Sequence, residues 1–325
     1  MNNNNKFHVS DLLNVEGATV FFALAVLVLF SSVFAPSFLT PENISNVLVQ
    51  SVFVMILGIG MTYVLISGGI DLSVGSAMGL AAAVCVYCIN AGLPLPLALL
   101  LGLATGAAAG FVNAYLIVCL GFADFIATLG TLSLMRGIVE VMTASTRLNS
   151  KDPGFMFLAG GSLGGVPFAV LVALVVAIVA GVILARTTMG RAVYGVGLNP
   201  KSSFLAGVLV NRVRFSVFVV SGLCAGLSGI LLASRLSSVH PAMGTGYELT
   251  AIAAAALGGA SLSGGRGSVL GTALGALFLA ILQNTLSLMS VNAFWFQIIT
   301  GVIIVLAVLL DGGVRRFVAQ RARTA

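Results

Sequence analysis

The sequence has very little charge. Lys and Arg number 15 and Asp and Glu number 9, so charged residues make up 7% of the 325, against roughly 25% in a soluble domain. Hydrophobic residues make up 59%, and the mean hydropathy is +1.14. Because a soluble protein needs ionisable side chains over its surface, this composition excludes a soluble enzyme, a nucleic-acid-binding protein and a disordered chain. It predicts an integral membrane protein.

The chain also lacks the residue patterns that several chemistries need. Its three lysines, Lys6, Lys151 and Lys201, have no glycine-rich lead of a phosphate-binding loop, so no Walker-type ATP site is predicted. No His or carboxylate pair has the helical spacing of a metal site. We therefore expect no catalytic residue, no metal and no cofactor in this chain. Carboxylates are scarce within the apolar runs, which argues against a self-sufficient ion-coupled secondary transporter, the alternative from another class.

Apolar runs near the length that crosses a bilayer, about 20 residues, fill most of the chain. They are apolar on all sides, which indicates helices rather than the alternating strands of a membrane barrel. The eighth run is too short to cross alone, so it is either a buried half-helix or a span lengthened by the polar stretch before it. The ten predicted segments are 18–35, 47–67, 72–90, 94–118, 124–144, 166–185, 213–234, 249–259, 268–288 and 294–310.

Basic residues predict the orientation of these segments, because Lys and Arg are retained on the cytoplasmic side. With a cytoplasmic N-terminus, eleven of the fifteen basic residues fall inside, three fall outside, and Arg136 lies within the fifth segment. Arg136 and Glu140 are four residues apart on one helix, which predicts an internal ion pair. The fold class predicted is therefore an all-α polytopic membrane protein of about ten transmembrane helices, with both termini in the cytoplasm.

The charge pattern also divides the chain. A cytoplasmic tail over 1–17 precedes a single transmembrane domain over 18–311, and a basic cytoplasmic tail follows over 312–325. The transmembrane domain contains one long basic loop, 186–214. We expect this loop on the cytoplasmic face.

Two glycine-rich breaks interrupt the apolar runs. The first reads GGIDLSVGS over 68–76, and its glycines permit a tight turn. Asp71 and Ser73 are placed to cap the following helix by accepting its free amide hydrogens. The alternative is a direct role of these side chains in lining or gating a pathway through the membrane. The second break reads GGASLSGGRGS over 258–268 and repeats GGxxLS, either through internal duplication or by chance in a glycine-rich chain.

The basic loop contains a short amphipathic segment. Asn199 is a good N-cap, Pro200 suits the first helical position and Gly207 suits the end, so a helix is predicted over about 200–206. An exposed apolar patch on this helix favours docking of a protein partner. The alternative is a helix that lies on the bilayer interface. The patch consists of Phe204, Leu205 and Val208.

These segments resemble the permease subunits of ATP-binding-cassette importers, specifically the ribose-type sugar permeases, over residues 40 to 311. The resemblance rests on GGIDLSVGS at 68–76, on GR-x5-G-x-N at 190–199, and on GYEL at 246–249 followed by ALGGASLSGGRGSVLG at 256–271. After Asn199 the chain departs from the family pattern, but small residues replace small residues there. Branched-chain amino acid permeases share the general organisation and look different around GIDLS.

The resemblance implies a permease that passes a sugar, ribose or a related monosaccharide, from a periplasmic binding protein into the cytoplasm. The alternative substrate is another small solute, such as an amino acid, a nucleoside or an autoinducer. ATP and Mg would bind a separate cytoplasmic ATPase subunit. The other implied partners are a second permease chain, identical or closely related, and the lipid of the bacterial inner membrane, with no nucleic acid.

The resemblance also implies three sets of site residues. Those expected to couple to the ATPase are Gly190, Arg191, Gly197, Asn199, Pro200, Phe204, Leu205, Gly207 and Val208. Those expected to line or gate the translocation pathway are Gly68, Gly69, Asp71, Ser73, Gly75, Glu248, Gly258, Gly259 and Ser261. Those expected to contact the binding protein are Arg147, Lys151 and Arg235.

Overall fold

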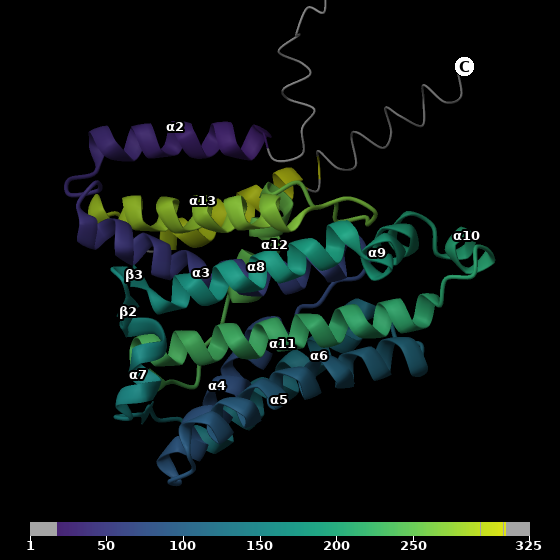
Figure 1. Ribbon diagram of the computed structural model, residues 1–325, viewed down its shortest axis with the longest axis horizontal. Coiled ribbons are helices and arrows are strands. Elements are labelled where there is room, and N and C mark those ends of the chain that lie inside the picture. The colour runs from purple at the N-terminus through teal and green to yellow at the C-terminus, as the bar shows by residue number, and fades with distance from the viewer. Residues whose placement is uncertain (1–17, 293, 308, 310–325) are drawn as a thin grey trace, which may run out of the picture.

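The structure is a computed structural model that describes residues 18–292, 294–307 and 309 (Figure 1). The predicted tails, 1–17 and 312–325, lie outside the described residues. Within the described part the regular secondary structure is helical, apart from short strands of two residues each. Most long helices lie with their axes nearly parallel or antiparallel (Figure 1). The all-α fold class is confirmed, and the chain is a polytopic membrane protein.

Each predicted segment contains or overlaps a helix. Six helices of the described part are long and apolar enough to cross a membrane, as judged by length and composition, and four further apolar helices are shorter. The helices longer than eight residues are α2 (Ala18–Phe34), α3 (Pro41–Ile66), α4 (Val74–Asn90), α5 (Leu95–Ala114), α6 (Asp124–Thr143), α8 (Phe168–Arg186), α9 (Thr188–Leu198), α11 (Val210–Leu236), α12 (Tyr247–Leu257), α13 (Val269–Leu288) and a helix over Phe294–Ala307.

Local chemistry sets several of these boundaries. Helix α3 begins six residues before the predicted segment, because the Thr40 hydroxyl accepts a hydrogen bond from the Asn43 amide at 3.3 Å and Pro41 occupies the first turn. Helix α5 continues as one π-helical stretch, η1 (Tyr115–Cys119), which lengthens it to a full span.

The eighth segment is a buried half-helix. Helix α12 has only 11 residues, and its alanines from Ala253 to Ala255 are fully buried. The polar stretch before it, 240–246, is not helical and does not lengthen it. That stretch packs against α4, where a Cβ added to Gly79 would lie 2.7 Å from the Met243 carbonyl oxygen. Irregular backbone of this kind is tolerated at membrane depth only where protein covers it.

The two ends of the bundle differ. One end, at the left of Figure 1 and here called the α7 end, carries α7 (Pro153–Gly160), the β2–β3 hairpin (Ser162–Leu163 and Val166–Pro167), and a second antiparallel pair, β1–β4 (Leu148–Asn149 and Ser238–Val239). The opposite end, here called the α10 end, carries α9 and the short α10 (Pro200–Leu205). The basic loop therefore protrudes from a single end.

Helix α3 occupies the middle of the bundle, and 83% of its most apolar window is buried. It contacts α8, α11, α12 and α13. Small residues let other helices approach closely, since Gly106 of α5 lies against the backbone of Gly222 and Gly226 in α11. Helices α5 and α11 therefore pack backbone to backbone at this crossing, as is expected where lipid supplies no hydrophobic drive between helices.

Candidate functional site

The three motifs that the sequence singled out meet where α3 ends. The Ile66 carbonyl oxygen accepts a hydrogen bond from the Gly265 amide at 2.8 Å. A Cβ added to Gly197 in α9 would collide with the same Ile66 carbonyl and lie 2.7 Å from the Gly265 nitrogen. A Cβ added to Gly264 would lie 3.0 Å from Cα of Gly68. We call these five residues the glycine junction, because they join both glycine-rich breaks to the basic loop 186–214.

Side-chain hydrogen bonds reinforce the junction. The Tyr194 hydroxyl of α9 donates to the Gly267 carbonyl oxygen at 2.6 Å. The Tyr63 hydroxyl, one turn before the end of α3, donates to the Ala180 carbonyl oxygen of α8 at 2.5 Å. The first bond holds α9 against the chain that leads into α13, and the second holds the end of α3 against α8.

Helix α10 forms as predicted and ends at Leu205. The Asn199 side-chain oxygen accepts from the Ser202 amide at 3.0 Å, Pro200 occupies the first turn, and Gly207 has a φ of +83°. Phe204 is 68% exposed and Leu205 is 78% exposed, which confirms an apolar patch. Val208 is half-buried and contributes less than expected. Leu198 and Leu209, which the prediction missed, are also exposed on this loop.

The remaining coupling candidates have local packing roles. Gly190 in the first turn of α9 lies against the Leu184 carbonyl, where a Cβ would collide, and its amide hydrogen-bonds to the Thr187 hydroxyl at 3.2 Å. Arg191 is exposed on the same helix. The junction therefore brings Gly197 to the two glycine-rich breaks, while Gly190 packs at the turn between α8 and α9.

Asp71 is the hub of a buried hydrogen-bond network. It is 1% exposed, and its Oδ1 accepts from the Ser73 amide at 3.0 Å and from the Ser73 hydroxyl at 2.6 Å. Its Oδ2 accepts from the Ser221 hydroxyl of α11 at 3.0 Å. Asn113 of α5 donates to the Ser73 hydroxyl at 2.6 Å and accepts from the Thr131 hydroxyl of α6 at 2.6 Å. Four helices are thereby joined.

The network corrects the predicted capping role. Ser73 is the N-cap residue of α4, but its side chain makes no capping bond, because its hydroxyl is occupied by Asp71 and Asn113. Asp71 accepts the amide of Ser73 itself rather than an amide inside the helix. The local geometry of Asp71 is thus that of a turn-forming residue whose second oxygen reaches a neighbouring helix.

Replacing Asp71 by alanine is expected to lower the stability of the protein. Loss of the carboxylate leaves the Ser73 and Ser221 hydroxyls without an acceptor in a buried site, at a cost of about 3 kcal/mol. Thermal unfolding in detergent measures this, with Ser133→Ala as the control, because the exposed Ser133 hydroxyl bonds only within its own helix. An unchanged melting temperature together with lost transport would instead assign Asp71 to the pathway.

An ion pair ties α6 to α11 beside the first glycine-rich break. Arg214 Nη2 lies 2.7 Å from Asp124 Oδ1 and 2.8 Å from Oδ2, and both side chains are partly exposed. Asp124 Oδ2 also lies against Gly69, 2.8 Å from the position of an added Cβ. The pair anchors the start of α6 to the same backbone turn that forms the glycine junction.

The predicted ion pair between Arg136 and Glu140 is wrong. Across the described residues the only ion pair within 4.0 Å is that of Arg214 and Asp124. Arg136 instead donates to the Ser76 hydroxyl of α4 at 3.2 Å and to the Thr245 hydroxyl. The Arg136 side chain reaches both oxygens because α6 packs against α4, and the chain before α12 lies beside the first turn of α4. Glu140 stays exposed.

Glu248 lies in the first turn of α12 and faces α4. Its Oε1 accepts from the Gly246 amide at 3.2 Å, while its Oε2 is buried and has no hydrogen-bond partner in the described part of the chain. A Cβ added to Gly75 would collide with Oε2. Gly75 is thus required for the carboxylate to approach α4.

The pathway candidates therefore fall in separate places. Gly68 and Gly69 belong to the turn at the glycine junction, and Asp71 and Ser73 belong to the buried network. Gly258 packs on the Gly271 backbone between α12 and α13. Gly259 has a φ of +89°, and Ser261 donates its amide to the Arg266 carbonyl oxygen at 3.0 Å within the second break. Of the nine candidates, only Glu248 lines the cavity described next.

That cavity lies between α3, α12, α13 and the helix over Phe294–Ala307 and has a volume of about 480 Å³. Its lining includes three glutamines and two aromatic side chains besides Glu248. Sequence reasoning missed the glutamines, although glutamine is rare in this chain and each falls within a predicted span. The residues are Gln50, Gln283, Gln297, Tyr247 and Phe296.

The residues expected to meet a binding protein all lie at the α7 end. Arg147 and Lys151 flank β1 and are exposed. Arg235, near the end of α11, donates to the Asn46 side-chain oxygen at 2.8 Å and is also exposed. The structure thus separates this basic set from the basic loop 186–214 by the length of the bundle.

Residues 43–308 match the family described as the permease component of the branched-chain amino acid transport system. The chain belongs to this permease family, whose members are membrane components of importers and not enzymes. The expected resemblance is confirmed by this match and by the relatives below.

Three relatives align over nearly their whole length. The ribose import permease protein RbsC of Bacillus subtilis (strain 168) is 39% identical over 293 residues, which cover 90% of this chain and 91% of that protein. The D-allose transport system permease protein AlsC of Escherichia coli (strain K12) is 34% identical over 293 residues, with 90% of each covered. The autoinducer 2 import system permease protein LsrC of Salmonella paratyphi B is 35% identical over 302 residues, covering 93% and 87%. No solved structure matches the chain.

Proposed function

We propose that this chain is the permease subunit of an ATP-driven importer that passes ribose or a related monosaccharide from a periplasmic binding protein into the cytoplasm. The observation that carries the proposal is the 39% identity to a ribose import permease over 90% of the chain. The permease works with a second permease chain and a cytoplasmic ATPase, which binds ATP and Mg. The D-allose relative, also a sugar permease by its name, supports the same substrate class.

The chain crosses the bacterial inner membrane ten times, with both termini in the cytoplasm. Six long helices and four shorter apolar ones supply the crossings. The eighth crossing combines the irregular stretch 240–246, whose Met243 and Gly244 are buried, with α12. The α10 end is cytoplasmic, because the basic loop 186–214 emerges there. The α7 end then faces the binding protein.

The glycine junction transmits the state of the ATPase to the membrane. Phe204 and Leu205 of α10 insert into the ATPase, and α9 carries the displacement to Gly197. Because Gly197 touches both the Ile66 carbonyl and the Gly265 amide, a shift of α9 moves the end of α3 and the chain before α13 together. These helices would have two alternative packings. Closure of the ATPase upon ATP binding would stabilise one packing over the other and so shift the population of permeases toward it.

Reconstitution of the complete importer tests this function. Wild-type permease, its ATPase and its binding protein in proteoliposomes are expected to accumulate radiolabelled D-ribose only when ATP is enclosed on the ATPase side. An uncoupler should leave uptake unchanged. Uptake without ATP that an uncoupler abolishes would identify a secondary transporter, and failure of an ATPase to copurify would contradict the importer.

Autoinducer 2 is the second candidate substrate, favoured by the 35% identity to a permease for it. Its carbon skeleton is small and polyhydroxylated, so the same cavity chemistry would serve both. Competition decides between them. An excess of autoinducer 2 that blocks ribose uptake, with ribose unable to block autoinducer 2 uptake, would transfer the proposal to the autoinducer.

A further inference from the structure

The cavity of about 480 Å³ gathers three of the four glutamines of the chain. Glutamine occurs only four times in the chain, and Gln50, Gln283 and Gln297 line this one cavity. They come from three different helices, α3, α13 and the helix over Phe294–Ala307. These three polar groups are far apart along the chain, and the packing of the helices brings them into one cavity.

These amides are not used to hold the fold. None of the three glutamine side chains makes a hydrogen bond with another group among the residues that the structure describes. The contrast with Asn43 and Asn284 is clear, because these neighbours bind each other through both amides, at 2.8 and 3.0 Å. Gln50 is half-buried, and Gln283 and Gln297 are exposed, so the three amides can be reached from outside the core of the bundle. Each glutamine thus keeps two donors and an acceptor free for a ligand.

A carboxylate and two aromatic rings complete the lining. Glu248 lines the cavity, and its Oε1, which accepts from the Gly246 amide at 3.2 Å, is the oxygen left to meet a ligand, because the buried Oε2 faces Gly75 of α4. Tyr247 and Phe296 supply rings to the same cavity. Neutral amides, a carboxylate acceptor and flat apolar faces match a molecule that carries many hydroxyls around a C–H framework. Cationic groups are absent from the lining, so an anionic ligand is not favoured.

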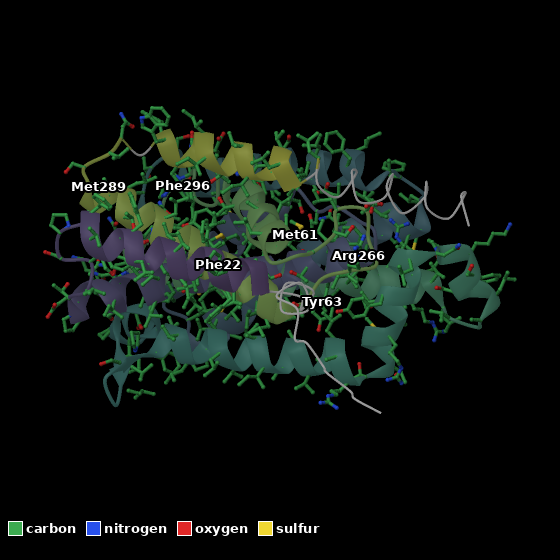
Figure 2. The ribbon with its side chains drawn as sticks, turned by 90° about the horizontal axis from the view of Figure 1, so that it is seen from above. Phe22, Met61, Tyr63, Arg266, Met289 and Phe296 are labelled. Atoms are coloured by element: carbon green, nitrogen blue, oxygen red, sulfur yellow. The ribbon has the colours of Figure 1, made fainter. Side chains whose placement is uncertain are left out.

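The cavity continues toward the α7 end. A smaller cavity of about 180 Å³ shares Gln50, Gln283 and Phe296 with the larger one and extends along the end of α13 to Ser287 and Val291. Figure 2 shows Phe296 on the side of the bundle where Met289 lies, well away from Arg266. The polar lining therefore extends from near the α7 end inward to Glu248.

The geometry points to a binding site for a small neutral polyol within each permease chain, formed by Gln50, Gln283, Gln297 and Glu248, with Phe296 as a stacking surface. This inference rests on the proposed import function and deepens it. The site receives the sugar on the side of the binding protein and replaces its water hydrogen bonds one by one. It implies that the permease recognises hydroxyl-rich solutes itself, in addition to any selection by the binding protein.

Paired variants at two positions test the site in the reconstituted importer. Gln283→Leu with Gln297→Leu removes two amides at nearly constant volume, and is expected to reduce the maximal rate of ATP-driven D-ribose uptake about tenfold. Gln283→Asn with Gln297→Asn keeps both amides and is expected to stay within about twofold of wild type. The sugar concentration for half-maximal uptake should remain that set by the binding protein in both.

A second measurement needs neither ATPase nor binding protein. D-ribose at millimolar concentration is expected to slow maleimide modification of a Gln297→Cys variant in detergent, while modification of the native, exposed Cys119 stays constant. Equal uptake by the Leu and Asn pairs, or no protection of the new cysteine, would overturn the site and leave the importer intact. Absence of any ATP-driven ribose uptake by wild type would overturn the proposed function, and the site with it.

Discussion

Replacing Phe204 and Leu205 together by aspartate is expected to abolish sugar-stimulated ATP hydrolysis and uptake while the permease remains folded. Both side chains are largely exposed, so they contribute little to the stability of the permease alone. In the proposed complex, burial of each in a groove of the ATPase would contribute about 2 kcal/mol. Loss of both weakens docking by about a thousandfold, and two charges would have to enter an apolar groove.

Ser202→Asp is the matched control for this double variant. Ser202 is exposed on the same helix, so an aspartate at this position introduces a negative charge and leaves the apolar patch in place. An acidic residue in the first turn of a helix is also compatible with the helix dipole. Copurification of the ATPase with each permease variant, followed by ATPase assays in proteoliposomes, measures the effect. Unchanged sugar-stimulated ATPase activity in the Phe204 and Leu205 variant would remove α10 from the coupling mechanism.

The long helices and α10 could be predicted because each depends on local sequence. Apolar runs set the helices, and the short range from Asn199 to Gly207 contains its own start and stop signals. The break at α12 was predictable for the same reason, since 11 apolar residues are too few to span a membrane. Local sequence could not predict which groups each buried polar side chain would bind.

Arg136 shows why partners were harder to predict. Spacing along one helix favoured Glu140, but the guanidinium binds oxygens on α4 and before α12, which are distant in the sequence. The Asp71 network likewise depends on Asn113 and Ser221, which lie in no recognisable sequence motif. Their only sequence signal is that they are polar residues inside apolar spans, and such residues face the protein interior.

The glycines were recognised as a class, but their separate roles needed the fold. The spacing of glycines in the sequence does not distinguish Gly197, which touches two distant backbone segments, from Gly130, whose added Cβ would meet nothing within 4 Å. The distinction matters for the proposed coupling, because a shift at Gly197 would press on two other backbone segments and a shift at Gly130 on none.

Gly197→Ala is expected to lower the melting temperature and to abolish transport. The new Cβ would collide with the Ile66 carbonyl and approach the Gly265 amide, so the hydrogen bond between them must break or α9 must move away. Both clashing groups are backbone, which leaves no flexible side chain to give way. Overpacking of this kind costs about 3 kcal/mol, more than the gain of about 1 kcal/mol from alanine in a helix.

Gly160→Ala provides the comparison at the last residue of α7, where an added Cβ meets nothing within 4 Å. That variant is expected to change the free energy of unfolding by less than about 0.5 kcal/mol. Thermal unfolding in detergent and ATP-driven uptake are measured on both. Because the junction lies between α10 and the membrane helices, any Gly197→Ala protein that folds should still dock the ATPase and hydrolyse ATP without sugar uptake. Wild-type melting and uptake in Gly197→Ala would show that the junction carries neither packing nor coupling.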